Sequence, residues 1–435
     1  MTAVTQELTS APSAALSQLV VGYLPTERNA LAAQRRNLAQ ALSAGSPRPV
    51  QSIDLRMAGS PYRAFAILSS AEPWLEVLDR TLQEASDFQS DAQRGLWWGS
   101  EVDGEVVASP LAWVMPGSGS LKATFYEDLA ALDPVVVRVR EEAELAFWQH
   151  TGEQVSFLDL ADEEDPRSTH PRYQRPATVT ASVAMARLLG RYGIQPQLLA
   201  GHSVGELTAC HLAGCFDLSE LIRLTTAPFL GETLAVGAMC ALIGDEAVIL
   251  QVIQEAGGSV MVSNRNSLRQ LVISGPAAEI QAIIPKAKAA GLKAIALKVA
   301  TAYHSPFLEE PHRRYREALA STRFQKARMP VVSGLTTDIL PWSEVNFSQT
   351  RALLDCAFIG PVNHVGQVRR LQELGMGALV DLGPTEKLSK LARDILDIQT
   401  ITALGANPTK GSGRQGFLEC LAQLHTLGYS ITVPE

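Results

Sequence analysis

A serine between two glycines carries the clearest chemistry in the sequence. Gly201-His202-Ser203-Val204-Gly205 follows an apolar stretch and precedes a helical pattern. On a sharp strand-to-helix turn, the positions two before and two after the serine have no room for side chains. We therefore expect Ser203 to be a nucleophile for acyl transfer, with the Val204 N–H in the oxyanion hole. The alternative is a glycine turn without a catalytic role.

A second oxyanion donor has to come from another segment. The sequence P-G-S-G-S at 116–120 follows the apolar strand expected at 111–115 and resembles a tight turn before a helix. We expect the Ser118 N–H to be this donor, with a purely structural turn as the alternative. A phosphate-binding loop fits less well, because Lys122 stands at the wrong position for one.

A histidine is the usual base for such a serine, and composition does not choose among the candidates. His202 neighbours the nucleophile, where adjacent side chains diverge, so we expect it to line the pocket. His304 lies in a loop, where functional residues concentrate, and is the expected base. A helix-capping or buried polar role is its alternative. The chain has eight histidines: His150, His170, His202, His211, His304, His312, His364 and His425.

The elements around these residues predict an α/β fold. Strands and helices alternate over 111–236 and 300–402, which indicates a mostly parallel sheet with helices on both faces, as in an α/β-hydrolase-like core. Between them, 237–299 has the order β-α-β-β-α-β and is expected to form a ferredoxin-like small subdomain. Flanking linker-like elements complete the fold.

Three flanking segments are expected. Residues 1–50 are predicted to form a helical extension, closed by Gly45, Pro47 and Pro49. Residues 51–110 alternate between strand and helix patterns, as in a small α+β subdomain. Residues 403–435 contain a loop and a last helix.

Composition narrows the class of protein. The chain has 435 residues and a net charge of −8, from 37 basic and 45 acidic residues, with no basic run suited to nucleic acid. The five cysteines show no C-x-x-C spacing, which suits reduced thiols and a cytoplasmic location. No apolar run is long enough for a membrane span. We expect no membrane or nucleic-acid partner, no metal and no cofactor.

Several motifs together resemble the malonyl-CoA:acyl-carrier-protein transacylase family, including the acyltransferase domains of polyketide synthases. The resemblance covers most of the chain, and 62–110 and the tail after 403 are similar to linkers that flank such domains. The motifs are P-G-S-G-S at 116–120, G-H-S-V-G-E at 201–206, N-S-L-R-Q-L-V-I-S-G at 266–275, A-Y-H-S-P at 302–306, P-V-N-H at 361–364 and V-D-L-G-P at 380–384.

The resemblance implies roles for individual residues. Ser203 would attack a thioester and His304 would move the proton, while Asn363 would orient the histidine through its backbone carbonyl. Expected partners are an acyl carrier protein, an acyl-CoA or acyl-carrier thioester, and polyketide synthase modules. Asn266 and His202 would belong to the substrate pocket.

The pocket departs from the family pattern. Pro228 stands where carboxyacyl-specific members have an arginine that binds the malonyl carboxylate, and proline cannot supply that fork of hydrogen bonds. Arg265 is a conceivable substitute, otherwise a solvent-facing residue. Thr301 and Tyr303 depart from the usual specificity tetrad ahead of His304. We therefore expect a non-carboxylated acyl group.

Three functions remain in competition. The first is a free-standing transacylase that moves a non-carboxylated acyl group to a carrier protein in polyketide or fatty-acid-like biosynthesis. The second is an editing hydrolase that removes stalled acyl groups from carrier proteins with the same residues. The third is a catalytically idle docking module, against which the intact Ser203 and His304 argue.

Overall fold

The chain forms two compact units. The computed structural model describes residues 18–20, 62–68, 89–91, 96–100, 109–119, 121, 124–162, 164–231, 237–299, 301–396, 401–407 and 412–432. One unit comprises Met1–Ala108, Leu189–Gln195 and Gln415–Glu435, and the other comprises Ser109–Leu188 and Pro196–Arg414. Every candidate site residue lies in the second unit.

The first unit contains a four-stranded antiparallel sheet of order β1-β2-β4-β3. Its strands are β1 (Gln18–Val20), β2 (Tyr62–Leu68), β3 (Gln89–Asp91) and β4 (Leu96–Ser100). Within the helical extension predicted over 1–50, the described residues form β1, a strand paired with β2, rather than helix. The rest of that prediction lies outside the described residues.

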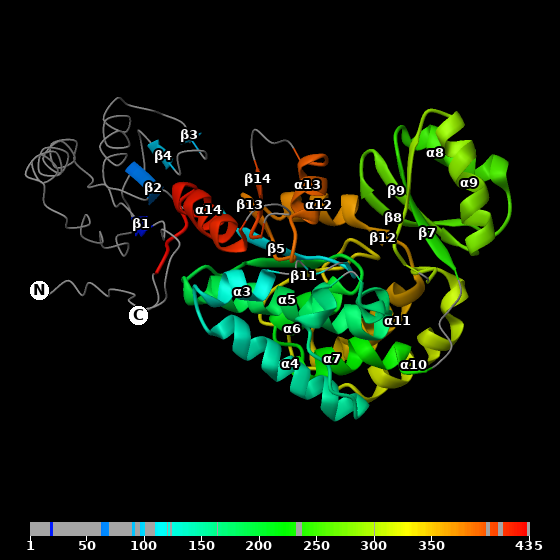
Figure 1. The fold of residues 1–435 in the computed structure, drawn as a ribbon, viewed down its shortest axis with the longest axis horizontal. Helices are drawn as coiled ribbons and strands as arrows, with labels where there is room; N and C mark the ends of the chain where they lie inside the picture. The colour runs from blue at the N-terminus through cyan, green and yellow to red at the C-terminus, as the bar shows by residue number, and fades with distance from the viewer. Residues whose placement is uncertain are drawn as a thin grey trace, which may run out of the picture. The chain divides into compact units, whose positions relative to one another are not determined.

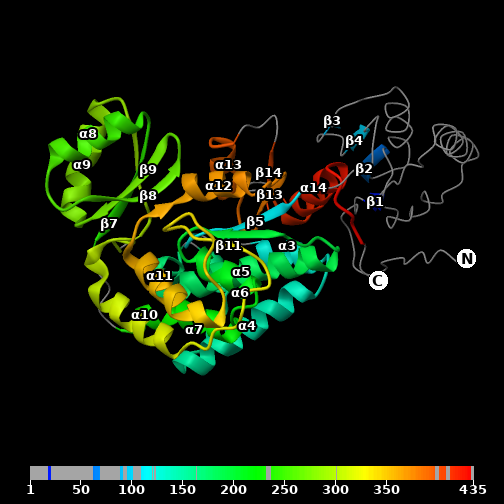
Figure 2. The same cartoon turned by 180° about the vertical axis from the view of Figure 1, so that it is seen from behind.

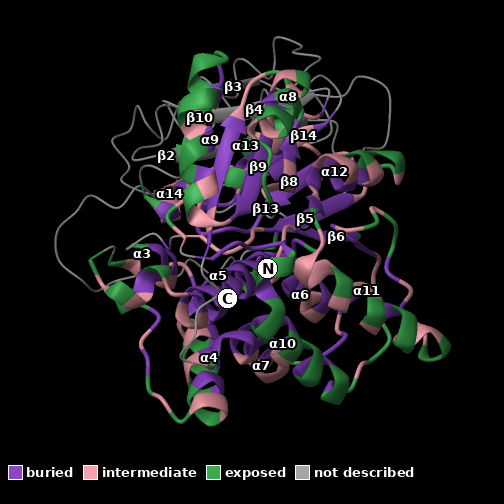
Figure 3. Ribbon diagram, turned by 90° about the vertical axis from the view of Figure 1, so that its right-hand side faces the viewer, coloured by how far each residue is buried: buried purple, intermediate pink, exposed green. Residues whose placement is uncertain are grey.

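A parallel sheet forms the centre of the second unit. Its order is β11-β6-β5-β13-β14, and every neighbouring pair is parallel. The strands are β5 (Leu111–Met115), β6 (Leu198–Gly201), β11 (Val331–Val332), β13 (Ala378–Asp381) and β14 (Thr402–Gly405). All residues of β5, β6 and β13 are buried, as Figure 3 shows in purple, because helices cover both faces. The expected α/β class is confirmed.

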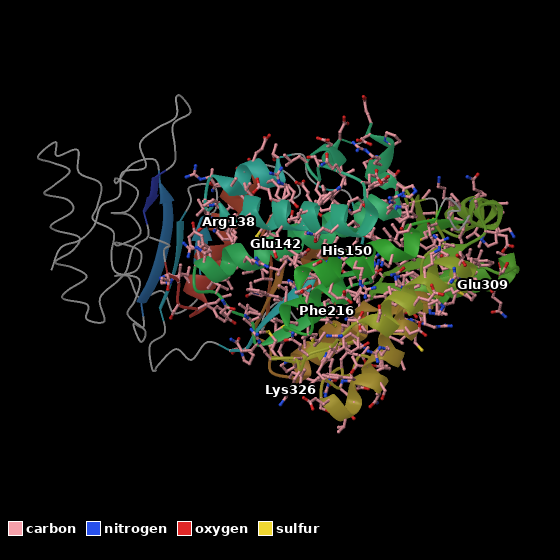
Figure 4. The ribbon with its side chains drawn as sticks, turned by 90° about the horizontal axis from the view of Figure 1, so that it is seen from below. Arg138, Glu142, His150, Phe216, Glu309 and Lys326 are labelled. Atoms are coloured by element: carbon pink, nitrogen blue, oxygen red, sulfur yellow. The ribbon has the colours of Figure 1, made fainter. Side chains whose placement is uncertain are left out.

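Helices lie on both sides of this sheet (Figures 1 and 2). On one side, α12 (His364–Glu373) and α13 (Lys387–Arg393) pack Val368, Leu371 and Leu388 against the strands. The helices on the other side are α3 (Phe125–Ala130), α4 (Val135–Thr151), α5 (Pro171–Arg191), α6 (Gly205–Leu212), α7 (Leu218–Thr226), α10 (Glu309–Ser321) and α11 (Phe347–Ile359). Arg138, Glu142 and His150 project from α4 in Figure 4.

A smaller sheet of order β10-β7-β9-β8-β12 has α8 and α9 on one face. Its first four strands are antiparallel, and β12 (Val362–Asn363) joins β8 in parallel. The β-α-β-β-α-β order is present, while the hydrolase-like and ferredoxin-like assignments stay predictions. The other elements are β7 (Ala238–Ile243), α8 (Glu246–Ala256), β8 (Met261–Ser267), β9 (Gln270–Gly275), α9 (Ala277–Ala289) and β10 (Lys293–Ala296).

The C-terminal segment contains the last helix, α14 (Gly413–Thr426), within the region where a linker-like helix was expected. Among the helices that the structure describes, none has the length and apolar character to span a bilayer.

Candidate active site

Ser203 stands on the turn between β6 and α6, in a backbone conformation that only glycine adopts readily. Its φ is 57°. A Cβ at Gly201 would lie 2.0 Å from the carbonyl carbon of Gly205, and a Cβ at Gly205 would lie 2.2 Å from the Met115 carbonyl oxygen. These are rigid backbone atoms, so both positions require glycine. The turn therefore has the tight geometry that the sequence predicted.

The Ser203 and His304 side chains meet directly. Ser203 Oγ lies 2.7 Å from His304 Nε2, and His304 Nδ1 lies 2.9 Å from the Gly360 carbonyl oxygen. A carbonyl can only accept, so Nδ1 carries the proton and donates it to Gly360. Nε2 is then unprotonated and accepts the Ser203 hydroxyl proton, which is the tautomer that a general base needs.

The orienting carbonyl belongs to Gly360, and this corrects the role expected for Asn363. Asn363 lies at the start of α12, where its side chain accepts from the Gly366 N–H at 2.9 Å and its own N–H donates to Gly334 at 2.7 Å. Gly360 is the C-cap residue of α11, and its N–H donates to the Cys356 carbonyl oxygen. The chain turns between these two points, so the carbonyl that faces His304 comes from the helix end.

Burial lowers the pKa of His304. His304 is 6% exposed, and desolvation lowers its pKa to about 4, with smaller contributions from His202 and the Arg175 charge. The hydrogen bond to Gly360 acts in the opposite direction. His304 is therefore neutral at pH 7 and able to accept a proton.

Both segments expected to supply oxyanion donors lie next to Ser203. Val204 precedes α6 as its N-cap residue and lines the same cavity as Ser203. A Cβ on Gly117 would lie 3.1 Å from Ser203 Cβ, so the turn that contains Ser118 packs against the nucleophile. The donation itself by Ser118 stays a prediction.

A small cavity opens at the two side chains. Its volume is ≈ 30 Å³. Tyr303 lines it, as expected for a pocket residue, and its ring lies 6.2 Å from that of Phe229. The lining includes Ser203, His304, Tyr303, Arg175, Tyr315 and Phe358.

Four other expected pocket residues are placed beside this cavity rather than in its lining. His202 Nε2 lies 2.8 Å from Asn266 Oδ1, which connects the nucleophile turn to β8 of the smaller sheet. Pro228 is buried in a 3-10 turn, Ala227–Phe229, and Thr301 is buried ahead of His304. Within the described lining, only Tyr303 of the five meets the cavity.

Sequence reasoning missed Arg175 and Gly360. Arg175 precedes Pro176 and an uncharged stretch, 176–186, within helix α5, and it is buried. A single arginine before such a stretch was the available indication. Gly360 had no comparable indication, because its role depends on where the end of α11 packs.

Comparisons with known proteins identify relatives of this chain. The acyl transferase domain family matches residues 112–429. A malonyl CoA-acyl carrier protein transacylase of Escherichia coli (strain K12) is 31% identical over 303 residues, 67% of this chain and 95% of that protein. The spectinabilin polyketide synthase system protein NorB of Streptomyces orinoci is 28% identical over 317 residues, which are 72% of this chain. The chain spans only 14% of the length of NorB.

Two solved structures have a similar fold. The acyltransferase domain from the second module of the salinomycin polyketide synthase aligns with a TM-score of 0.72 at 25% identity, over 95% of this chain and 94% of that one. The malonyl CoA-acyl carrier protein transacylase of Coxiella burnetii gives a TM-score of 0.64 at 25% identity, over 74% and 100%. The chain therefore belongs to the acyl transferase domain family, as malonyl CoA-acyl carrier protein transacylases and polyketide synthase acyltransferase domains do.

Proposed function

We propose that this chain transfers a short acyl group from a thioester to the thiol of an acyl carrier protein through an ester on Ser203. The observation that carries the proposal is the 2.7 Å contact between Ser203 Oγ and His304 Nε2 on a turn that requires glycine at two positions. A hydroxyl held on an unprotonated imidazole nitrogen is an activated nucleophile.

The first half of the reaction loads the enzyme. His304 Nε2 takes the Ser203 proton while Oγ forms a bond to the thioester carbonyl carbon. The carbon–sulfur bond then breaks, and the proton passes from Nε2 to the leaving thiolate. In the second half the carrier thiol gives its proton to Nε2 and its sulfur attacks the ester, and Ser203 regains the proton as the Oγ–carbon bond breaks.

In both halves a negative charge develops on the acyl oxygen. We assign its stabilisation to the backbone N–H groups of Val204 and Ser118, which belong to the two segments packed at Ser203. Donors fixed in the backbone need no rearrangement as the charge forms, which makes this kind of stabilisation effective.

The partner and the acyl group follow from different observations. The relatives include an acyl carrier protein transacylase and a polyketide synthase acyltransferase domain, so we infer a carrier protein as acceptor. The ≈ 30 Å³ cavity suits an acyl group of only a few atoms. Pro228 is the basis for expecting an uncharged acyl group. Arg175 also lines the cavity, so this residue bears on whether the acyl group is charged.

Acyl loading followed by intact mass tests the proposal. Wild type and Ser203→Ala would be incubated with short acyl-CoA thioesters, with and without excess carrier protein. We expect an acyl adduct on wild type alone, which disappears as acylated carrier accumulates. Free acid released despite excess carrier would instead favour the editing hydrolase, and absence of any adduct on folded wild type would overturn the proposal.

A further inference from the structure

Arg175 places a buried positive charge in the same cavity as Ser203 and His304. It projects from α5 and is 4% exposed, yet it lines the cavity with both residues. Its charge also contributes to the lowered pKa of His304, so the guanidinium lies within electrostatic reach of the reacting atoms.

Among its described residues, the protein supplies a hydrogen-bond acceptor to only one of the guanidinium nitrogens of Arg175. Arg175 Nε donates to the Thr225 carbonyl oxygen at 3.3 Å. The guanidinium carbon lies 5.2 Å from the ring centre of Phe229 and 5.7 Å from that of Phe358. Within the part of the chain that the structure describes, the Nη atoms have no hydrogen-bond or ion-pair partner.

An unpaired guanidinium in this position is costly. Arginine stays protonated when it is buried, and removing a charge from water costs free energy unless a counter-ion is present. The aromatic rings interact with the charge but accept none of the N–H bonds. The Nη donors are therefore free for an anion, and a planar guanidinium matches a carboxylate with two parallel hydrogen bonds.

Two other arginines are already engaged: Arg265, which the sequence suggested as a substitute for the missing arginine, and Arg223, which lies five residues before Pro228. Arg223 pairs with Glu220, and Arg265 pairs with Glu246 on the smaller subdomain. The 3-10 turn that contains Pro228 nevertheless lies close to Arg175, because the ring of the next residue, Phe229, contacts the guanidinium. A positive charge is therefore present near Pro228, and it belongs to Arg175 of α5.

We propose that Arg175 binds a carboxylate at the far end of the acyl group while the thioester carbonyl faces Ser203, so that Arg175 determines specificity for short dicarboxylic acyl thioesters. This inference rests on the proposed function and specifies its substrate class. It replaces the expectation of an uncharged acyl group, which considered Pro228 without Arg175.

The test compares malonyl-CoA with acetyl-CoA, which lacks the carboxylate. Initial rates of Ser203 loading would be followed by intact mass for wild type, Arg175→Gln, Arg175→Lys and the control Arg172→Gln. Arg172 lies on the same helix but pairs with Glu153 at 2.8 Å. Circular dichroism would establish that each variant is folded.

We expect wild type to load malonyl about 10-fold faster than acetyl or more. Arg175→Gln should lower the malonyl-to-acetyl ratio on the order of 100-fold, and Arg175→Lys roughly 10-fold, because a point charge remains but the fork is lost. Arg172→Gln should keep the wild-type ratio. A wild type that prefers acetyl, or an Arg175→Gln ratio equal to that of wild type, would overturn the inference.

Binding without turnover separates this inference from the proposed function. Calorimetric titration of Ser203→Ala with the two thioesters should give tighter binding of malonyl-CoA, and adding Arg175→Gln should remove the difference. If wild type loads acetyl but not malonyl, only the Arg175 inference fails. If nothing loads yet the calorimetric preference persists, only the transfer mechanism fails. Should Arg175→Gln not fold, the wild-type ratio and Arg175→Lys still decide.

Discussion

Ser203 and His304 share a left-handed backbone conformation, with φ of 57° and 55°, and their side chains meet at 2.7 Å across 101 residues of sequence. Such a conformation costs an ordinary residue about 1–2 kcal/mol. Two of the three described non-glycine residues with positive φ are therefore the two residues of the proposed dyad. Backbone strain is concentrated where the reacting side chains must be aimed.

The first prediction concerns pH. Desolvation lowers the pKa of His304 to about 4, and only the neutral imidazole can accept the Ser203 proton. The loading rate should therefore stay constant as pH falls through 6.5, the ordinary histidine pKa, and drop near pH 4. Single-turnover loading between pH 4 and 8, with circular dichroism at each pH, measures this. A midpoint near 6.5 would show that His304 is not held in a desolvated state.

The same shift has a consequence for stability. The unfolded chain binds a proton at this histidine near pH 6.5, while the folded chain binds it only near pH 4, so falling pH favours unfolding between these values. His304→Gln should flatten this part of the stability curve. Urea unfolding of both proteins at pH 7 and pH 5 tests it, and an unchanged pH dependence in the variant would contradict it.

The second prediction concerns the base itself. Replacing His304 by Gln should lower the loading rate about 10²–10⁴-fold, because the amide cannot take the Ser203 proton. His150→Gln is the matched control: His150 lies on α4 (Figure 4) and is not among the described residues that line the cavity. Its Nε2 lies 3.0 Å from Ser219 Oγ. Stopped-flow loading with one thioester compares the two. Equal losses would assign the effect to folding rather than to proton transfer.

How far the sequence predicts this site depends on the range of each interaction. The requirement for Gly201 and Gly205 is local, since the clashing atoms belong to the same turn and the preceding strand. The pattern around Ser203 therefore contains the information. Gly360 is different, because it meets His304 only through the packing of α11, and no local pattern tells which carbonyl in the turn before Asn363 will face the histidine.

Arg175 and β12 were missed by sequence reasoning for related reasons. An arginine usually indicates an exposed position, and only the packing of α5 against Phe229 and Phe358 reveals this one as buried. β12 has two residues, too few to show any alternation, and it joins the smaller sheet through its pairing with β8. The α/β pattern and the subdomain order, in contrast, extend over long periodic segments.

The third prediction concerns the turn. Gly201→Ala would drive a Cβ to 2.0 Å from the Gly205 carbonyl carbon, and neither backbone segment can move without shifting Ser203. We expect loss of acyl loading and a large loss of stability. Gly152→Ala is the control, because Gly152 has φ of 72° but open space around it, so only the left-handed penalty of about 1–2 kcal/mol applies. Loading by Gly201→Ala at the wild-type rate would contradict the clash.

The last prediction concerns Asp381, a buried carboxylate at the end of β13. Its oxygens accept from the N–H groups of Gly383 at 2.9 Å, Leu388 at 2.7 Å and Ser389 at 3.0 Å, so it fixes the start of α13 on the sheet. Asp381→Ala leaves three donors without this partner, and unsatisfied buried donors cost about 1–3 kcal/mol each. We expect a loss of about 3 kcal/mol or more in the free energy of unfolding.

Asp245→Ala provides the comparison, because Asp245 makes the same kind of contact where water can replace it. Its exposed side chain caps α8 through the N–H groups of Ala247 and Val248. Losing such a cap costs about 1 kcal/mol. Urea unfolding followed by tryptophan fluorescence and circular dichroism measures both variants against wild type. Equal losses would mean that burial does not amplify the role of Asp381, whereas a threefold larger loss at Asp381 would identify it as a main anchor between β13 and α13.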